Sequence, residues 1–276
     1  MIKSFSKINL FLKVLKKEKS GLHNIQSSVM LLKLHDSIVI KNSNKDEIKF
    51  VGHFAKNINK NINSISITLF ALRKYNLINK KKKYKIVINK NIPVFGGLGG
   101  GTGNAAFLVK YFIKKKISNK LLSNFEKLIG SDFRLFFFKH SFQKGLKNIF
   151  KFKNFLLYFV LVYPNINCST QEIYSKIKKT SRPLRSNILG ISSKNKFIEF
   201  IKSENNDLQT IVEKKHKKIK IILNLIRQQK NCLFSRMTGS GSVCFGAFLD
   251  RKSASLGLNA IKKKFPNYWC TLTKSI

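Results

Sequence analysis

One stretch of this 276-residue chain decides its fold, namely Pro93-Val94-Phe95-Gly96-Gly97-Leu98-Gly99-Gly100-Gly101-Thr102-Gly103-Asn104-Ala105-Ala106, which holds six of the chain's 15 glycines. Glycine loses more backbone entropy on folding than any other residue, so this cluster indicates a loop with a special backbone task. The β-branched run at 84–89 predicts a strand before the loop, and 104–113 predicts a helix after it. A strand, a glycine-rich loop and a helix N-terminus present backbone N–H groups to an anion, so the stretch predicts a phosphate-binding loop.

The residues after the last glycines indicate which class of phosphate-binding loop this stretch belongs to. A Walker-type loop ends in a Lys-Ser or Lys-Thr pair, which this loop lacks. Residues 101–106 fit the G-x-G-x-x-A form of the dinucleotide fingerprint, which would indicate a nicotinamide-dependent oxidoreductase. That fingerprint expects a second strand ending in an acidic residue about 20 residues further on. The chain there, at 121–128, instead has the pattern of a helix with Glu126 inside it, so a different family fits better.

Four segments resemble motifs of the GHMP small-molecule kinases, and they occur in the same order. The glycine-rich stretch resembles the loop P-x-G-x-G-L-G-G-G-S-S-x-A-A, and its triple glycine is typical of the 4-diphosphocytidyl-2-C-methyl-D-erythritol kinase branch. Residues 6–12 are similar to A-K-[IL]-N-L-x-L, 129–134 to L-G-A-D-V-P, and 237–245 to M-[ST]-G-[ST]-G. Shorter likenesses at 21–26, 170–174 and 206–208 extend the resemblance over nearly the whole chain.

The resemblance implies an α+β fold with the two-domain GHMP kinase architecture. Residues 1–150 would form an ATP-binding N-terminal domain similar to domain 2 of ribosomal protein S5, and 151–276 a ferredoxin-like C-terminal domain. The basic, polar stretch at 148–154 is an independent boundary signal. Hydrophobic patterning predicts strands at 8–14, 27–34, 36–41, 155–163, 243–249 and 269–272, and helices at 64–75, 121–129, 171–177, 194–202, 208–227 and 252–263.

The implied activity is transfer of a phosphoryl group from ATP, with Mg²⁺, to the 2-hydroxyl of 4-diphosphocytidyl-2-C-methyl-D-erythritol in non-mevalonate isoprenoid biosynthesis. Phosphoryl transfer needs alignment and charge stabilisation more than covalent chemistry. The implied ATP-binding residues are Pro93, Val94, Phe95, Gly96, Gly97, Leu98, Gly99, Gly100, Gly101, Thr102 and Gly103. Thr102 is also the one candidate ligand for Mg²⁺, and the alternative interpretation is that it caps the following helix.

The resemblance assigns the catalytic roles to Asp132 and Lys7. Asp132 would accept the proton of the acceptor hydroxyl, and Lys7 would orient that hydroxyl and stabilise the carboxylate. Taken without the family, Lys7 is one of many lysines in this chain. A carboxylate beside the aromatic run after Asp132 needs a cationic or hydrogen-bonding partner, so we expect these two side chains to meet.

Four further residues match substrate contacts of the family, and three of them have a plainer alternative. Asn9 would contact the acceptor, or it is a polar residue at a strand edge. His23 would read the cytosine, or it is a structural loop histidine. Tyr174 matches one of two rings that enclose the base, and Thr170 would hydrogen-bond the substrate or cap a helix.

Four positions depart from the family pattern. Leu22 stands where the second ring is usual, and Gly103 replaces a serine of the loop. Phe95 replaces a loop glycine, and Arg134 replaces the proline after the catalytic aspartate. These departures bear on catalytic efficiency more than on the kind of enzyme.

The charge of the chain is extreme, with 54 Lys and Arg against 12 Asp and Glu, formally +42. Such a balance is typical of proteins that bind nucleic acid or membrane surfaces. However, the lysines are scattered along the chain, and the abundance of Lys, Asn, Ile and Phe is what AT-rich codons produce. We therefore interpret the charge as compositional drift. A GHMP kinase for homoserine or mevalonate, and a basic RNA-binding protein on a decayed kinase scaffold, remain as alternatives.

The remaining features indicate a cytoplasmic enzyme with a small-molecule substrate. The cysteines form no C-x-x-C pair, which favours free thiols. The longest apolar run, 155–163, is far shorter than the roughly 20 residues of a membrane span, and no secretory signal is evident. We expect no specific nucleic acid, no membrane partner, and a monomer or weak homodimer.

Overall fold

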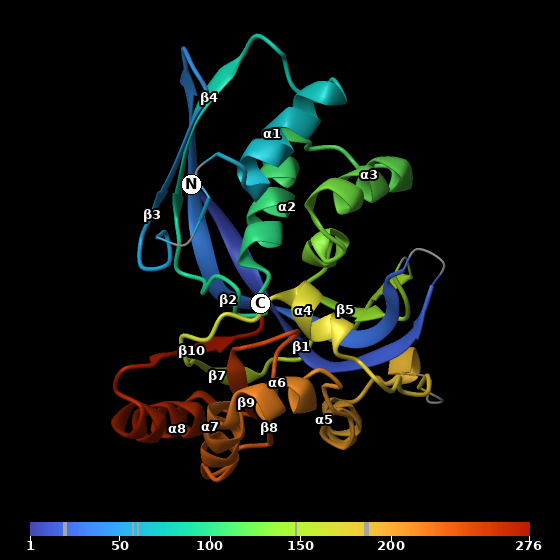
Figure 1. The fold of residues 1–276 in the computed structure, drawn as a ribbon, viewed down its shortest axis with the longest axis vertical. Coiled ribbons are helices and arrows are strands. Elements are labelled where there is room, and N and C mark those ends of the chain that lie inside the picture. Colours follow the sequence, from blue (N-terminus) through green and yellow to red (C-terminus); the bar gives the residue numbers. More distant parts are fainter. Residues whose placement is uncertain (19–20, 57, 60, 147, 185–187) are drawn as a thin grey trace. The chain divides into compact units, whose positions relative to one another are not determined.

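The computed structural model describes residues 1–18, 21–56, 58–59, 61–146, 148–184 and 188–276 (Figure 1). They form two compact units: unit 1 is Met1–Lys7, Leu34–Val94 and Gly99–Phe138, and unit 2 is Ile8–Lys33, Phe95–Leu98 and Lys139–Ile276. Two long strands, β1 (Ile2–Lys17) and β2 (His23–Ser43), pair with each other and supply residues to both units. A single cut near residue 150 does not produce these units, and the domain boundary expected there stays a prediction.

Unit 1 packs helices on a small sheet. Strand β3 (Glu47–Val51) pairs parallel with β4 (Lys83–Asn89), which pairs antiparallel with 37–43 of β2. The helices are α1 (Ser64–Lys74), α2 (Gly100–Phe112), α3 (Asn119–Ile129) and the short 3₁₀ helix η1 (Phe133–Phe137). The core between strands and helices includes Ile38, Ile65, Leu69, Tyr84, Ile86, Ile88 and Leu108.

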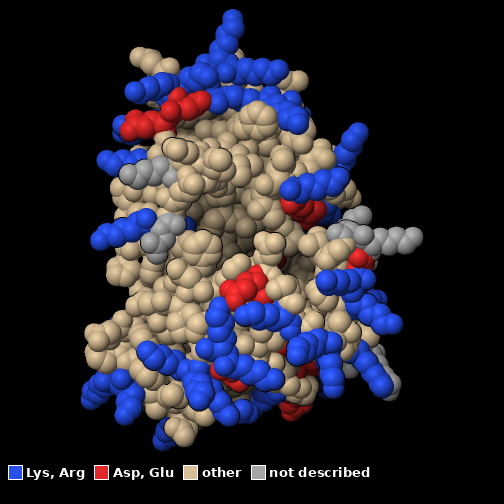
Figure 2. Space-filling view, in the orientation of Figure 1, with Lys and Arg blue, Asp and Glu red and all other residues tan. Residues whose placement is uncertain are grey.

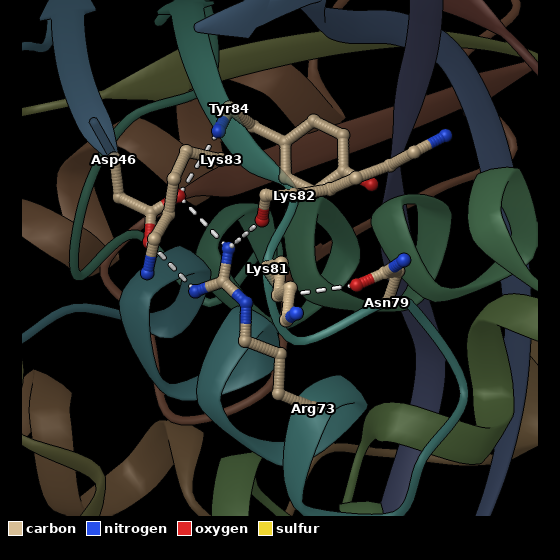
Figure 3. A network of polar contacts seen from close by, with 7 residues as sticks. All are labelled: Asp46, Arg73, Asn79, Lys81, Lys82, Lys83 and Tyr84. Carbon is tan, nitrogen blue, oxygen red and sulfur yellow. Dashed lines mark hydrogen bonds and ion pairs between the residues drawn. The ribbon is translucent and has the colours of Figure 1, made fainter. Parts of the chain in front are cut away.

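Polar contacts hold the two ends of α1. Asn63 caps its N-terminus and accepts hydrogen bonds from the N–H groups of Ile65 and Ser66. Near its C-terminus, the Arg73 guanidinium binds both carboxylate oxygens of Asp46, at 2.6 and 2.9 Å (Figure 3). Such a bidentate pair sets geometry as well as charge, so it fastens α1 to the chain before β3.

Unit 2 contains two sets of strands. Residues 27–30 of β2 pair antiparallel with β5 (His140–Gln143), which pairs with β6 (Ile149–Lys151). An antiparallel sheet in the order β10-β7-β9-β8 is built from β7 (Tyr158–Tyr163), β8 (Phe234–Met237), β9 (Cys244–Phe248) and β10 (Trp269–Lys274).

Helices complete unit 2. In Figure 1, α7 (Lys217–Arg227) and α8 (Arg251–Lys264) lie against the four-stranded sheet. The apolar side chains between them include Val160, Ile222 and Phe248. The remaining helices are α4 (Thr170–Ser175), η2 (Ile188–Gly190), α5 (Lys194–Ser203) and α6 (Gln209–Lys215).

Two predicted boundaries are wrong for identifiable reasons. The strands expected at 27–34 and 36–41 are one strand, β2, because the buried Asp36 is satisfied by hydrogen bonds from neighbouring segments and needs no turn. The helix expected at 208–227 is two helices, α6 and α7, which separate at His216, where the backbone is not helical (φ −133°, ψ 84°). The short strands β3, β5, β6 and β8 were not predicted, because they are too short to show a clear period.

The surface is strongly basic. Figure 2 shows Lys and Arg side chains in several separate groups on the face in view, rather than in one stripe. No helix within the described residues combines the length and the apolar character that crossing a membrane requires.

Candidate active site

The glycine-rich stretch forms the start of α2 in unit 1. The helix begins at Gly100, four residues before the position predicted from sequence, and Gly99 precedes it in the left-handed conformation (φ 68°). The first hydrogen bond of the helix runs from Gly103 N to Gly99 O, at 2.8 Å. No side chain caps this end, and its first turn contains no acidic residue. The N–H groups of the first turn and the helix dipole therefore suit an anion.

Close packing explains why these helical positions are glycines. A Cβ at Gly103 would lie 2.9 Å from Cε1 of Phe136, and one at Gly100 would lie 3.1 Å from Cγ2 of Ile92. Carbon atoms do not approach that closely without displacement. The glycines thus allow the helix start to pack tightly, and the serine that the family has at position 103 has no room for its Cβ here.

Lys7 and Asp132 meet beside this helix start. Lys7 Nζ lies 3.3 Å from Asp132 Oδ2, and the two side chains are 5% and 34% exposed. A Cβ at Gly99 would lie 3.0 Å from Lys7 Cγ and 3.3 Å from Lys7 Cε, so the lysine stem passes directly against Gly99. The expected convergence of an ammonium and a carboxylate is therefore present within unit 1, with the carboxylate still accessible.

Thr102 faces the turn that carries Asp132. Its hydroxyl oxygen would lie 3.7 Å from a Cβ at Gly130, two residues before the aspartate. Thr102 is the third residue of α2, and the N-cap is Gly99, so the alternative that Thr102 caps the helix is wrong. The described residues contain no group of three or more His, Cys, Asp and Glu side chains that could hold a metal ion.

A buried ion pair behind the loop was not predicted. Asp36 is fully buried and accepts hydrogen bonds from Lys90 Nζ, from the N–H groups of Asn91 (2.7 Å) and Ile92 (2.9 Å), and from Asn104 Nδ2 (3.1 Å). It thereby joins β2, the segment entering the loop, and α2. An acidic residue inside an apolar strand is a sequence signal for such a cluster, because a buried carboxylate requires partners.

In unit 2, residues 95–98 of the glycine-rich stretch pack on the turn within the motif segment 237–245. Gly96 O accepts a hydrogen bond from Val243 N at 3.2 Å. Gly97 has φ 78°, and a Cβ there would lie 2.2 Å from Thr238 O, so only glycine fits. The Thr238 hydroxyl accepts a hydrogen bond from Asn9 N at 3.0 Å. Three of the four motif segments therefore contribute residues to one place in unit 2.

The side chains of Asn9 and Thr170 also have defined positions in unit 2. Asn9 is 3% exposed, and its Nδ2 donates to Ser27 Oγ at 2.8 Å, so its side chain is held in the interior of unit 2. The hydroxyls of Thr170 and Ser240 are 3.0 Å apart. The cap of α4 is Ser169, which accepts a hydrogen bond from Glu172 N, so the alternative that Thr170 is the helix cap is wrong.

His23 and Tyr174 lie together, with ring centroids 6.0 Å apart and an interplanar angle of 36°. His23 Nδ1 is 3.0 Å from Leu15 O, and a carbonyl only accepts, so Nδ1 carries the hydrogen. In the neutral ring Nε2 is then an acceptor, and it is buried with no hydrogen-bond partner among the described residues. Leu22, which replaces the second ring, is 56% exposed. The pair provides one aromatic face and one buried acceptor that has no partner among the described residues.

The cysteines are not candidates for a catalytic nucleophile. All four are free, and three of them are buried. Burial raises the pKa of Cys232 and of Cys270 to about 11. The thiols therefore stay protonated at neutral pH and are poor nucleophiles.

Comparison with known proteins identifies the family to which this chain belongs. Residues 193–267 match the family described as GHMP kinases C terminal. A 4-diphosphocytidyl-2-C-methyl-D-erythritol kinase of Pelagibacter ubique is 41% identical over 285 aligned residues, which cover 100% of this chain and 98% of that protein. The chain belongs to the 4-diphosphocytidyl-2-C-methyl-D-erythritol kinase family of GHMP kinases. A member from Wolbachia pipientis is 30% identical, again over 100% of this chain and 98% of that protein.

Solved structures of GHMP kinases share the fold. A crystal structure of 4-(cytidine 5'-diphospho)-2C-methyl-D-erythritol kinase matches with a TM-score of 0.75 at 18% identity, and covers 99% of this chain and 98% of that one. Homoserine kinase from Cytophaga hutchinsonii matches with a TM-score of 0.69 at 15% identity, over 100% of this chain and 96% of that one. The family and the two-domain α+β fold predicted from sequence are thus confirmed, and the nicotinamide-dependent alternative is set aside.

Proposed function

We propose that this chain transfers the γ-phosphoryl group of ATP to the 2-hydroxyl of 4-diphosphocytidyl-2-C-methyl-D-erythritol, in isoprenoid precursor biosynthesis. One observation carries the proposal: Lys7 Nζ and Asp132 Oδ2 lie 3.3 Å apart, with the lysine stem against Gly99 at the start of α2. This arrangement supports an acid–base group and a cation beside a helix end that suits phosphate, and the alignments to relatives named for this substrate cover the whole length of this chain.

The loop fits the triphosphate of ATP. The uncapped first turn of α2 offers N–H donors and a favourable dipole, and the packed glycines 99, 100 and 103 leave no side chain in the way. We assign ATP binding to residues 93–103. Mg²⁺ bound with ATP would neutralise part of the phosphate charge, and the hydroxyl of Thr102 is its proposed contact with the chain.

Asp132 and Lys7 would then carry out the proton transfer. Lys7 donates a hydrogen bond to the acceptor hydroxyl and holds the carboxylate of Asp132 in place. Asp132 accepts the hydroxyl proton while the oxygen bonds to the γ-phosphorus, and the bond from that phosphorus to the leaving ADP oxygen breaks. The N-terminus of α2 stabilises the negative charge on the transferred group.

The residues of unit 2 suit a cytidine. His23 Nε2 is a buried acceptor without a partner among the described residues, so it matches the exocyclic amino group of cytosine. The ring of Tyr174 offers a face for the base. We assign Thr170 and Asn9 to polar contacts with the rest of the substrate. Homoserine and mevalonate carry no aromatic base, so this pair of rings favours the cytidine substrate over theirs.

The test is a reaction of the purified protein with ATP, Mg²⁺ and the cytidine substrate, followed by ³¹P NMR of the products. We expect one new phosphomonoester signal and stoichiometric ADP. Homoserine and mevalonate, offered in parallel, should give none. A protein that releases ADP only with homoserine or mevalonate, or forms no phosphorylated product, would refute the assignment.

Two finer expectations belong to the same proposal. We infer that the enzyme acts in the cytoplasm as a monomer or weak homodimer, and that its positive charge has no specific nucleic-acid partner. Light scattering across a range of protein concentrations would test the first point. Binding of RNA that is abolished at moderate salt and shows no sequence preference would support the second.

A further inference from the structure

Helix α2 and the 3₁₀ helix η1 carry the two parts of the site in unit 1. The phosphate-binding end belongs to α2, and Asp132 is the residue immediately before η1. The ring of Phe136 fills the space against both Gly99 and Gly103, so η1 packs on the very turn that is proposed to bind phosphate. Any shift of η1 along α2 would therefore move Asp132 relative to the phosphate group.

Lys110, near the C-terminal end of α2, fastens η1 to that helix. Its Nζ donates a hydrogen bond of 2.6 Å to the carbonyl oxygen of Phe136, in the last turn of η1. Carbonyls at this end of a helix lack partners within the helix, and a cation there is favourable. One ammonium thus joins the helix that would bind the phosphates to the element that carries the proposed base.

The surroundings of the ammonium make the contact a specific one. Nζ lies 4.7 Å from the ring centroid of Phe107 and 4.8 Å from that of Phe137. Phe107 comes from α2 and Phe137 from η1, so both elements contribute a ring to the same cation. Burial lowers the pKa of Lys110 to about 8, so at neutral pH the group is mostly charged although it has lost much of its water. A desolvated cation gains more from a carbonyl and two rings than an exposed one does.

We propose that Lys110 is a positioning residue for phosphoryl transfer, which acts by holding η1 against α2 and so keeping the carboxylate of Asp132 at a constant distance from the phosphate-binding turn. This inference rests on the function proposed above. Lys110 itself touches neither the proposed substrate residues nor the loop. Its effect should therefore fall on the rate of the bound complex rather than on substrate affinity.

The test compares Lys110→Met, Lys110→Arg and, as a matched control, Lys127→Met, which removes an exposed lysine of α3. Methionine keeps the apolar stem and loses the bond, so kcat should fall about 10-fold with both KM values within twofold, because small misplacements of a reacting group cost rate. Arginine keeps a cationic donor and should recover kcat to within threefold. Lys127→Met should behave like the wild type, and the melting temperatures show that each variant is folded.

Two results would overturn the proposal. One is a Lys110→Met enzyme whose kcat stays within twofold of the wild type. The other is an arginine variant as slow as the methionine variant although both melt like the wild type. Should the methionine variant not fold, Lys110→Gln, a polar side chain too short to reach the carbonyl, is expected to show the same fall in kcat. A wild-type protein inactive on the cytidine substrate would instead refute the proposed function, and this inference with it.

Discussion

Lowering the pH should destabilise unit 2 through one buried histidine. His140 on β5 is 1% exposed. Its Nδ1 lies 2.7 Å from Lys153 O and its Nε2 lies 2.8 Å from Ser28 Oγ. The Phe152 and Phe197 rings pack on it, with centroids 4.7 and 5.2 Å away. Since a carbonyl only accepts, Nδ1 carries the hydrogen, and Nε2 of a neutral ring can then accept from the Ser28 hydroxyl.

The sign and size of the effect follow from linkage. Burial lowers the pKa of His140 from 6.5 to about 4, against a smaller opposing contribution from the bond to Lys153. The unfolded chain takes up a proton at His140 near pH 6.5, and the folded chain does so only near pH 4. The contribution of the neutral His140 to stability is therefore fully present above pH 6.5, and it is lost as the pH falls between these values. Between pH 7.5 and pH 5 the loss is about 2 kcal/mol, and it approaches about 3 kcal/mol below pH 4.

Urea unfolding at pH 7.5 and pH 5 measures this loss. The single tryptophan, Trp269, lies in β10 of unit 2 and reports the unfolding of the unit that contains His140. Other groups also titrate over this range, so the control is His140→Gln, which cannot gain a proton. The wild type should lose about 2 kcal/mol more than the variant over this pH range. Equal pH dependence of the two proteins would refute the reasoning.

Three more substitutions test the site and its scaffold. Asp132→Asn should fold normally and lose about 10²–10⁴-fold in kcat, with ATP binding unchanged by calorimetry; near-normal turnover would exclude it as the base. Gly97→Ala would place a Cβ 2.2 Å from Thr238 O in a residue with φ 78°, so we expect the free energy of unfolding to fall by roughly 3 kcal/mol or more. A melting temperature equal to that of the wild type would contradict the packing described. Phe95 is 54% exposed and has φ 58°, so Phe95→Gly should remove backbone strain and raise the free energy of unfolding by about 1 kcal/mol. A larger KM for ATP in this variant would support the assignment of Phe95 to the ATP-binding residues. Lower stability would instead show that the ring packs against its neighbours.

Much of the fold could be predicted because many helices and strands follow from the hydrophobic period of a few neighbouring residues. The strand at 84–89, now β4, and the helix at 64–75, now α1, have clear periods of two and 3.6 residues. Asn63 supplies a local signal for the helix start, since a capping side chain and its N–H partners are close in sequence. The start of α2 was misplaced because glycine has a low helix propensity, which the packing of Phe136 and Ile92 overrides.

Some residues of the site could be predicted from motifs along the chain, whereas contacts between separate elements could not. The order of four motifs pointed to Lys7, Asp132 and the glycine-rich stretch, although their catalytic roles await the experiments above. The ion pair of Asp36 with Lys90 and the contact of Lys110 with Phe136 could not be foreseen, because each joins residues from separate elements in a chain with dozens of lysines.

The amino-acid sequence by itself determined the glycine-rich turn, the alternation of strands and helices, and the kinase family, because these depend on backbone freedom, hydrophobic period and ordered motifs along the chain. Only the tertiary structure decided which lysine pairs with the buried Asp36, which ring nitrogen of His23 is left without a partner among the described residues, and why a side chain at Gly97, Gly99 or Gly103 would collide with its neighbours. The physical reason is that charge pairing, burial and steric exclusion act over a few ångströms in space, between residues whose distance along the chain carries no trace of that proximity.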